Sequence, residues 1–162
     1  MKNNSRRNFI RRATLTGIAA CCFPQTRTFA AIQNESEKTK LKKGAVILFQ
    51  GDSITDGNRG RNEDPNHIMG HGYAFSIASR VGADYPEKKY KFYNRGISAN
   101  KVTDLEKRWQ TDTLDLKPDV LSILVGVNDA NSVVFNRQPS VSVEEYEEVY
   151  QELLEKTRAL FP

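Results

Sequence analysis

Residues 45–57 read AVILFQGDSITDG, and this stretch decides how the rest of the chain is interpreted. Its first five residues are all apolar, which predicts a strand of a parallel sheet that is covered on both faces. The run ends at Gln50 and Gly51, and the polar residues that follow predict a turn from the strand into a helix. At such a turn Ser53 would lie at the rim of the sheet, where nearby backbone N–H groups can face a developing oxyanion.

Two further apolar segments have the same organisation. Residues 90–94 (YKFYN) and 120–125 (VLSILV) predict strands, which stop near Gly96 and Gly126. Apolar residues at spacings of three and four predict helices, and these span residues 73–81, 102–116 and 142–160. The order βαβαβα predicts an open α/β sandwich with a parallel sheet, whose ligand site lies at the carboxyl ends of the strands.

The apolar stripes of these helices are expected to pack against the sheet. The last helix has the clearest start signal, because Ser142 can cap it and Glu145 would complete a capping box. Its stripe comprises Tyr146, Val149, Tyr150, Leu153, Leu154 and Leu160; that of the first helix comprises Ala74, Ile77, Ala78 and Val81.

A short polar motif follows each predicted strand. These motifs are Gly51-Asp52-Ser53-Ile54-Thr55-Asp56-Gly57, Asn94-Arg95-Gly96-Ile97-Ser98 and Gly126-Val127-Asn128-Asp129. A glycine lets a backbone N–H approach a ligand closely, and the Asn128 amide can donate to the same oxygen. Each motif alone is typical of an ordinary turn or cap, whereas three of them at the ends of three parallel strands favour a catalytic site.

With these motifs, residues 44–162 resemble the SGNH or GDSL hydrolases. The resemblance implies a flavodoxin-like three-layer α/β/α sandwich, of which about three strands are visible in the sequence. It also implies that Ser53 is the nucleophile, and that the Ser53 and Gly96 N–H groups and the Asn128 side chain form the oxyanion hole. Members of this family are mostly esterases that act on acyl or acetyl groups of lipids and carbohydrates, so an ester substrate and no cofactor are expected.

The family's fourth motif, an Asp-x-x-His that supplies the base and its orienting carboxylate, is not found after the third strand. The two histidines are His67 and His71, both in the loop after the first strand. Residues 64–67 do match Asp-x-x-His, but they follow the nucleophile by about a dozen residues, and we favour His67 and His71 as entrance or solvent residues. We therefore expect a C-terminally truncated chain with impaired catalysis and exposed apolar surface beside the third strand.

Two other classes of function stay open at this point. A binding module for carbohydrate or lipid on the same scaffold would be inert because it lacks the base. A flavodoxin-like nucleotide binder is disfavoured, because no Gly-x-Gly-x-x-Gly run or phosphate-binding lysine motif follows the first strand. No metal site is predicted, since the histidines and carboxylates show no ligand spacing.

The formal charge of +4 is concentrated at the N-terminus. Residues 1–30 hold six Lys or Arg and no Asp or Glu, which leaves 18 basic and 20 acidic side chains in the remainder, a net charge of −2. A nucleic-acid partner is therefore not expected. The basic stretch, the apolar run at residues 13–23 and the small residues up to Ala30 predict an export signal, and the Arg6-Arg7 pair resembles a twin-arginine signal read by that export machinery.

Two processing routes are compatible with this leader. Cleavage after Ala30 would remove Cys21 and Cys22 and leave a mature periplasmic or secreted protein without thiols. Residues 18–21 also resemble a lipoprotein box, in which case Cys21 would be lipidated and would anchor the protein to a membrane. Residues 31–43 are polar and aperiodic, which predicts a solvated linker.

Overall fold

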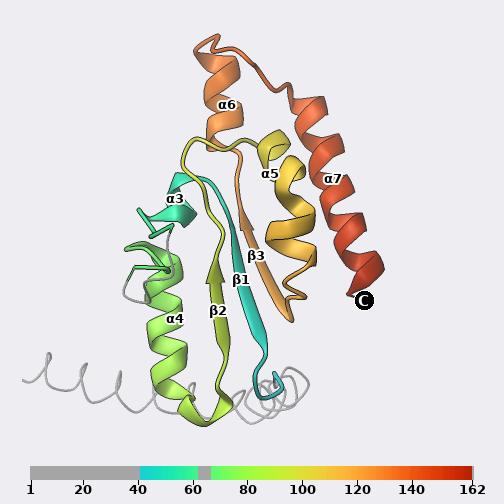
Figure 1. Cartoon of the computed structure of the whole chain (residues 1–162). Helices are drawn as coiled ribbons and strands as arrows, with labels where there is room; N and C mark the ends of the chain where they lie inside the picture. The colour runs from blue at the N-terminus through green and yellow to red at the C-terminus, as the bar shows by residue number, and fades with distance from the viewer. Residues whose placement is uncertain (1–40, 62–66, 162) are drawn as a thin grey trace, which may run out of the picture. The chain divides into compact units, whose positions relative to one another are not determined.

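The computed structural model describes residues 41–61 and 67–161 of the chain. Its sheet has three strands, which are β1 (Val46–Gly51), β2 (Lys91–Asn94) and β3 (Val120–Leu124). Its helices are α3 (Ser53–Asp56), α4 (Tyr73–Asp84), α5 (Val102–Trp109), α6 (Val127–Val134) and α7 (Val143–Leu160), with a 3₁₀ turn η1 (Pro86–Lys88) and a π-helical turn η2 (Gln110–Leu114) (Figure 1).

The three strands run parallel in the spatial order β2-β1-β3, so the apolar first strand is central. Phe49 is in register with Asn94 of β2 and with Ser122 of β3. Parallel strands bring their carboxyl ends to one edge of the sheet, and here the motifs that follow all three strands meet at that edge. The predicted strands are confirmed: β1 ends at Gly51, two residues beyond the apolar run, and the other strand boundaries lie within one residue of the prediction.

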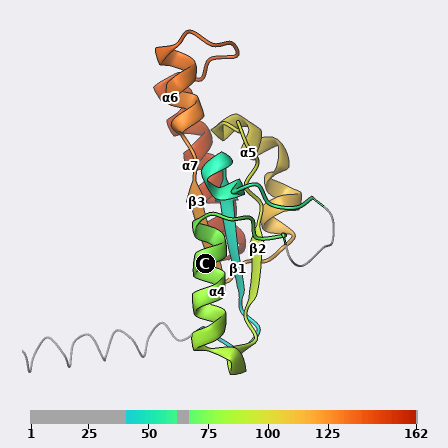
Figure 2. The ribbon, with the colours of Figure 1, turned by 90° about the vertical axis from the view of Figure 1, so that its left-hand side faces the viewer.

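Helices cover the central strand on both faces. On one face α4 packs over Ile47 and Phe49, and the ring of Phe49 meets that of Tyr73 edge-on with centroids 5.7 Å apart. On the other face α5, η2 and α7 enclose a core that includes Leu105, Trp109 and Leu153. Figures 1 and 2 show this three-layer arrangement, which confirms the predicted α/β/α sandwich.

Several boundaries differ from the prediction for local physical reasons. The second predicted helix stops at Trp109 and continues as the π-helical turn η2, which buries Thr113 and Leu114. The Ser142 hydroxyl accepts from the Glu145 N–H at 3.1 Å, so the predicted cap of α7 is confirmed. Helix α6 was not among the predicted helices, because it has only eight residues and its first three belong to the polar motif that follows β3.

Part of the predicted core is exposed. Leu160 of α7 is 58% exposed and Ile77 of α4 is 41% exposed, so both apolar stripes are only partly buried. Within the described residues β3 pairs with β1 alone, and its Val120 and Leu124 are 37% and 43% exposed. The apolar surface that was expected beside β3 is therefore present.

The predicted export signal and residues 31–40 of the predicted linker lie outside the described residues. None of the helices that the structure describes is long and apolar enough to cross a bilayer.

Candidate active site

Hydrogen bonds join the loops at the carboxyl ends of the three strands to one another in pairs. Each strand end is therefore fixed against the other two, which gives the rim of the sheet a defined geometry. The three bonds are Asp52 N–H to Leu124 O (3.4 Å), Ile97 N–H to Gly51 O (3.0 Å) and Asn128 Nδ2 to Asn100 O (3.0 Å).

Ser53 is exposed at the first position of α3, one residue after the buried Asp52. The Asp52 carboxylate caps this helix by accepting from the Ile54 N–H at 2.9 Å, which leaves the Ser53 N–H without a partner among the described residues. Gly51 permits the tight turn, because its φ is +156° and a Cβ there would overlap the carbonyl oxygen of Leu124. Ser53 thus presents both its hydroxyl and its amide at the rim.

Gly96 lies beneath α3, where its N–H already has a partner. This N–H donates to Asn94 Oδ1 at 2.9 Å, and a Cβ on Gly96 would overlap the backbone of Thr55 and Asp56. The Gly96 carbonyl accepts from Arg59 Nε at 2.8 Å. A glycine is required here for close packing of the β2 loop against α3, and its N–H is not available to a substrate in this structure.

Ala99, three residues further on, carries the unoccupied N–H of this loop. Its φ of +67° is unusual for a residue with a side chain. All the remaining N–H groups from Arg95 to Val102 have a partner in the described part of the chain. In order, omitting Ala99, the acceptors are Phe49 O, Asn94 Oδ1, Gly51 O, Asp56 Oδ2, Ile97 O, Asp104 Oδ2 and Asp129 Oδ1.

Asn128 enters this loop from the first turn of α6. Its Nδ2 donates to Asn100 O, the carbonyl one residue beyond Ala99, and the second hydrogen on Nδ2 has no acceptor among the described residues. The next residue, Asp129, is buried, and its Oδ1 accepts from the Val102 N–H at 2.9 Å. Burial raises the pKa of the Asp129 carboxyl, whose Oδ2 has no partner in the described part of the chain.

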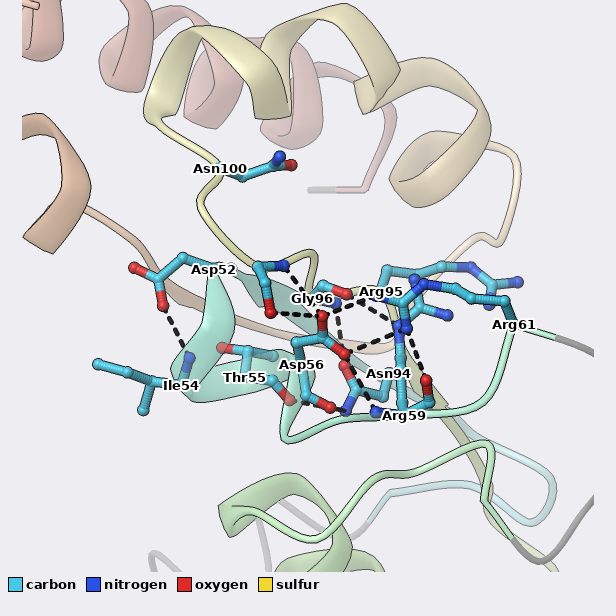
Figure 3. Close-up of polar contacts among 12 residues, drawn as sticks. Asp52, Ile54, Thr55, Asp56, Arg59, Arg61, Asn94, Arg95, Gly96 and Asn100 are labelled. Atoms are coloured by element: carbon cyan, nitrogen blue, oxygen red, sulfur yellow. Dashed lines mark hydrogen bonds and ion pairs between the residues drawn. The ribbon is translucent and has the colours of Figure 1, made fainter.

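The carboxylate of Asp56 fastens the β2 loop to α3. Its Oδ2 accepts from both the N–H and the hydroxyl of Ser98 at 2.9 Å, and Arg61 donates to both of its oxygens (Figure 3). Burial alone would raise the pKa of Asp56, but the hydrogen bonds from Arg61, Ser98 and the Arg59 N–H outweigh it and lower this pKa to about 2. Because Ser98 precedes Ala99, Asp56 also fixes where the Ala99 N–H lies.

We expect Asp56 to make stability depend on pH in acid. The folded pKa of about 2 lies below the ordinary value of 3.8, so its contribution is complete above about pH 4 and is lost as the pH falls through about 2. Asp56→Asn should therefore lower the free energy of unfolding by about 2 kcal/mol at pH 7. Urea titrations of both proteins between pH 7 and pH 2 should show this difference shrinking below pH 4.

Asp84→Asn is the matched control. This carboxylate pairs with Arg80 at 2.6 Å on the exposed side of α4, and an exposed pair of this kind contributes at most about 1 kcal/mol. An Asp56→Asn difference that stayed constant down to pH 2 would contradict the assigned role of the Asp56 charge.

The two histidines contact other residues than Ser53. His67 and His71 line an open hollow of about 650 Å³ together with Arg59 and Arg61, and their ring centroids are 5.9 Å apart. Ser53 is not among the residues that line this hollow, and no hydrogen bond joins either imidazole to it in the described part of the chain. Within the same residues no cluster of three or more His, Cys, Asp or Glu side chains could hold a metal ion.

Four residues at the rim were missed by the sequence interpretation, namely Asp56, Asn94, Ala99 and Arg108. The last of these donates from α5 to Gly51 O, Arg95 O and Asn100 Oδ1. Arg108 had a usable signal: it lies between Leu105 and Trp109 on the predicted apolar stripe, and a cation on a buried helix face needs several acceptors. Asn94 and Asp56 stood inside motifs already singled out for other residues. Ala99 gave no signal, since a positive φ at a residue other than glycine follows from its surroundings.

A three-layer α/β/α sandwich with an exposed serine after its first strand is the fold of a class of α/β hydrolases. The model of the GDSL-like lipase/acylhydrolase family matches residues 49–162, which is more than half of the chain. The chain therefore belongs to the GDSL-like lipase/acylhydrolase family.

Relatives in this family agree in sequence and in structure. An acetylxylan esterase of Geobacillus stearothermophilus is 37% identical over 126 residues, which are 75% of this chain and 58% of the relative. A putative GDSL-like lipase from Parabacteroides merdae superposes with a TM-score of 0.70 at 44% identity, over 76% of this chain and 57% of the other. An uncharacterized lipoprotein of Bacillus subtilis is 37% identical over 113 residues, 70% of this chain and 43% of the relative.

The chain thus spans less than two thirds of the length of these relatives. Solved structures of the G. stearothermophilus esterase include catalytic mutants in which a serine, an aspartate or a histidine is replaced by alanine. The replaced aspartate and histidine are three residues apart in that protein.

Proposed function

We propose that this chain carries the nucleophile and the oxyanion hole of a serine esterase. Ser53 is the nucleophile, and the donors are the Ser53 N–H, the Ala99 N–H and the Asn128 Nδ2. The observation that supports this proposal is the pattern of hydrogen bonds at the rim: within residues 41–61 and 67–161 these three groups each keep a donor without a partner, while the neighbouring N–H groups of the β2 loop are paired. Ala99 takes the place that the sequence interpretation gave to Gly96, because the Gly96 N–H donates to Asn94.

The reaction follows from this placement. The Ser53 oxygen attacks the carbonyl carbon of an ester, its proton passes to a base, and the carbonyl oxygen becomes an anion that the three donors stabilise. The bond from carbon to the alcohol oxygen then breaks, and the alcohol leaves with a proton from the base. Water, deprotonated by the same base, hydrolyses the acyl-serine and regenerates Ser53.

The base itself is proposed to be the histidine of an Asp-x-x-His pair other than residues 64–67, and these 162 residues hold no second pair of that spacing. Three features support this: His67 and His71 are grouped with Arg59 and Arg61, neither imidazole bonds to Ser53, and the catalytic aspartate and histidine of the G. stearothermophilus relative are three residues apart. General-base help contributes about 10² to 10⁴ in rate, so the chain on its own would be a slow esterase.

The substrate class is proposed to be acetyl or other short acyl esters of carbohydrates. The acetylxylan esterase relative supports this assignment, and the exposed position of Ser53 allows a bulky alcohol to stay outside the sheet. We further propose that residues 1–30 are an export signal, that residues 31–43 are a linker and that residues 44–162 belong to the hydrolase domain. Export to the periplasm or the exterior would place the esterase where polysaccharides occur, and the lipoprotein among the relatives is compatible with this.

A fluorophosphonate probe tests the proposal, because it reacts with a serine only where the hydroxyl is activated and the phosphoryl oxygen is stabilised. By the intact protein we mean this chain together with the proposed Asp-x-x-His pair. We expect the probe to label it at Ser53, located by peptide mass spectrometry, and not to label Ser53→Ala. A folded, unlabelled protein that still binds acetylated xylan would instead favour the carbohydrate-binding module. Circular dichroism of both proteins establishes that they are folded.

A further inference from the structure

Arg108 connects the loops that carry Ser53 and Ala99, and it reaches Asn128 through Asn100. It lies on α5, its side chain is only 14% exposed, and its ion pair with Asp112 is 2.9 Å long. Burial lowers the pKa of this guanidinium, and the Asp112 carboxylate opposes that effect. A cation buried this deeply requires several acceptors, and the neighbouring strand ends supply them.

The acceptors of Arg108 come from three different parts of the rim. From the end of β1 they are Gln50 Oε1 at 2.9 Å and Gly51 O at 3.4 Å; from the end of β2 it is Arg95 O at 2.7 Å; from the loop beyond Ala99 it is Asn100 Oδ1, which the Arg108 Nε meets at 3.0 Å. The fork of the guanidinium therefore spans the two loops that carry Ser53 and Ala99.

The contact with Asn100 reaches the third donor as well. The Asn100 side chain accepts from Arg108, while its backbone carbonyl accepts from Asn128 Nδ2 at 3.0 Å. Asn100 follows Ala99 directly, so a shift of Asn100 moves the Ala99 N–H and the Asn128 amide together. Figure 3 shows Asn100 on the loop that leads into α5, above Asp52 and above the cluster around Asp56.

We propose that Arg108 is a positioning residue of the esterase, which acts through Asn100 to hold the Ala99 N–H and the Asn128 amide in the geometry of the oxyanion hole. The inference rests on the proposed function. Asp56 fixes the loop on the Ser98 side of Ala99, and Arg108 fixes it on the Asn100 side. Lysine would not replace Arg108, because one ammonium cannot meet acceptors on three separate segments in a fixed plane.

The test is hydrolysis of 4-nitrophenyl acetate by the intact protein carrying Arg108→Ala or Arg108→Lys. Displacing a donor by about 1 Å costs up to about 10²-fold, so we expect kcat to fall about 10- to 100-fold in both variants while KM stays near the parent value. Lys107→Ala is the matched control, because Lys107 directly precedes Arg108 on α5 and its side chain is 73% exposed. Its kcat should equal that of the parent.

A double-mutant cycle with Asn100→Ala separates positioning from a general loss of packing. If Arg108 acts through Asn100, the combined variant should lose much less than the product of the two single losses. Asn100→Ala also keeps the test valid should Arg108→Ala fail to fold, because it removes the linking side chain and leaves Arg108 in place. Asn100→Ala alone should therefore lower kcat, with KM near the parent value.

Three results would overturn the inference. They are an unchanged kcat in folded Arg108→Lys, an unchanged kcat in Asn100→Ala, and losses that multiply in the cycle. If these occur while Ser53→Ala still abolishes hydrolysis, the role of Arg108 fails and the esterase stands. If Ser53→Ala hydrolyses the ester as fast as the parent, the proposed function fails first.

Discussion

Replacing Ser53 by alanine in the intact protein should reduce kcat for an acetyl ester by about 10⁴- to 10⁶-fold. The reason is that the covalent route disappears while the oxyanion donors remain. Alanine keeps the helical position and leaves the Ser53 backbone N–H in place, and the exposed side chain at this site contributes little to packing. The melting temperature should therefore stay close to that of the parent, and steady-state hydrolysis of 4-nitrophenyl acetate measures the loss.

Ser76→Ala is the control for this substitution. Ser76 is an exposed serine of α4, and within the part of the chain that the structure describes its hydroxyl donates to the Gly72 carbonyl alone, at 3.4 Å. Its removal should leave kcat unchanged. Activity in Ser53→Ala within tenfold of the parent would exclude Ser53 as the nucleophile, because no residual of an oxyanion hole alone approaches the full enzyme.

The architecture could be predicted because its signals are local. Side chains of a strand alternate between the two faces of a sheet, so a strand of five apolar residues leaves water only when both faces are covered. In the structure β1 is the central strand, between β2 and β3. Glycines near the strand ends fixed where each loop begins, so the edge of the sheet that carries the site followed from chain order alone. Helix α6 was missed because it is short and begins inside the polar motif that follows β3.

The donors of the site could be predicted only in part, because a glycine has two uses that a sequence does not distinguish. Gly96 was expected to open space for a ligand, whereas the structure uses it to let the β2 loop pack beneath α3. Among the described residues, the unpaired N–H of this loop belongs to Ala99, which has a positive φ and lies between Ser98, bonded to Asp56, and Asn100, bonded to Arg108. Such a choice depends on contacts between residues far apart in the chain.

Asn128→Ala tests the oxyanion hole independently of the nucleophile. Loss of one oxyanion donor costs about 10² to 10³ in kcat, and we expect a fall of that order in the intact protein with little change in KM. We expect kcat to fall without a change in KM because the Asn128 amide binds the carbonyl oxygen more strongly once that oxygen carries negative charge. 4-Nitrophenyl acetate suits this measurement, because its leaving group needs no proton and the rate then reports on the oxyanion step.

Asn131→Ala provides the matched control on the same helix. The side chain of Asn131 has no hydrogen-bond partner among the described residues, so its removal should leave kcat and KM as they are. Asn128 also holds the Asn100 carbonyl, so part of its effect would come through the position of Ala99. Asn128→Ala and Asn100→Ala should therefore be less than multiplicative in kcat, whereas equal kcat in Asn128→Ala and the parent would remove Asn128 from the proposed site.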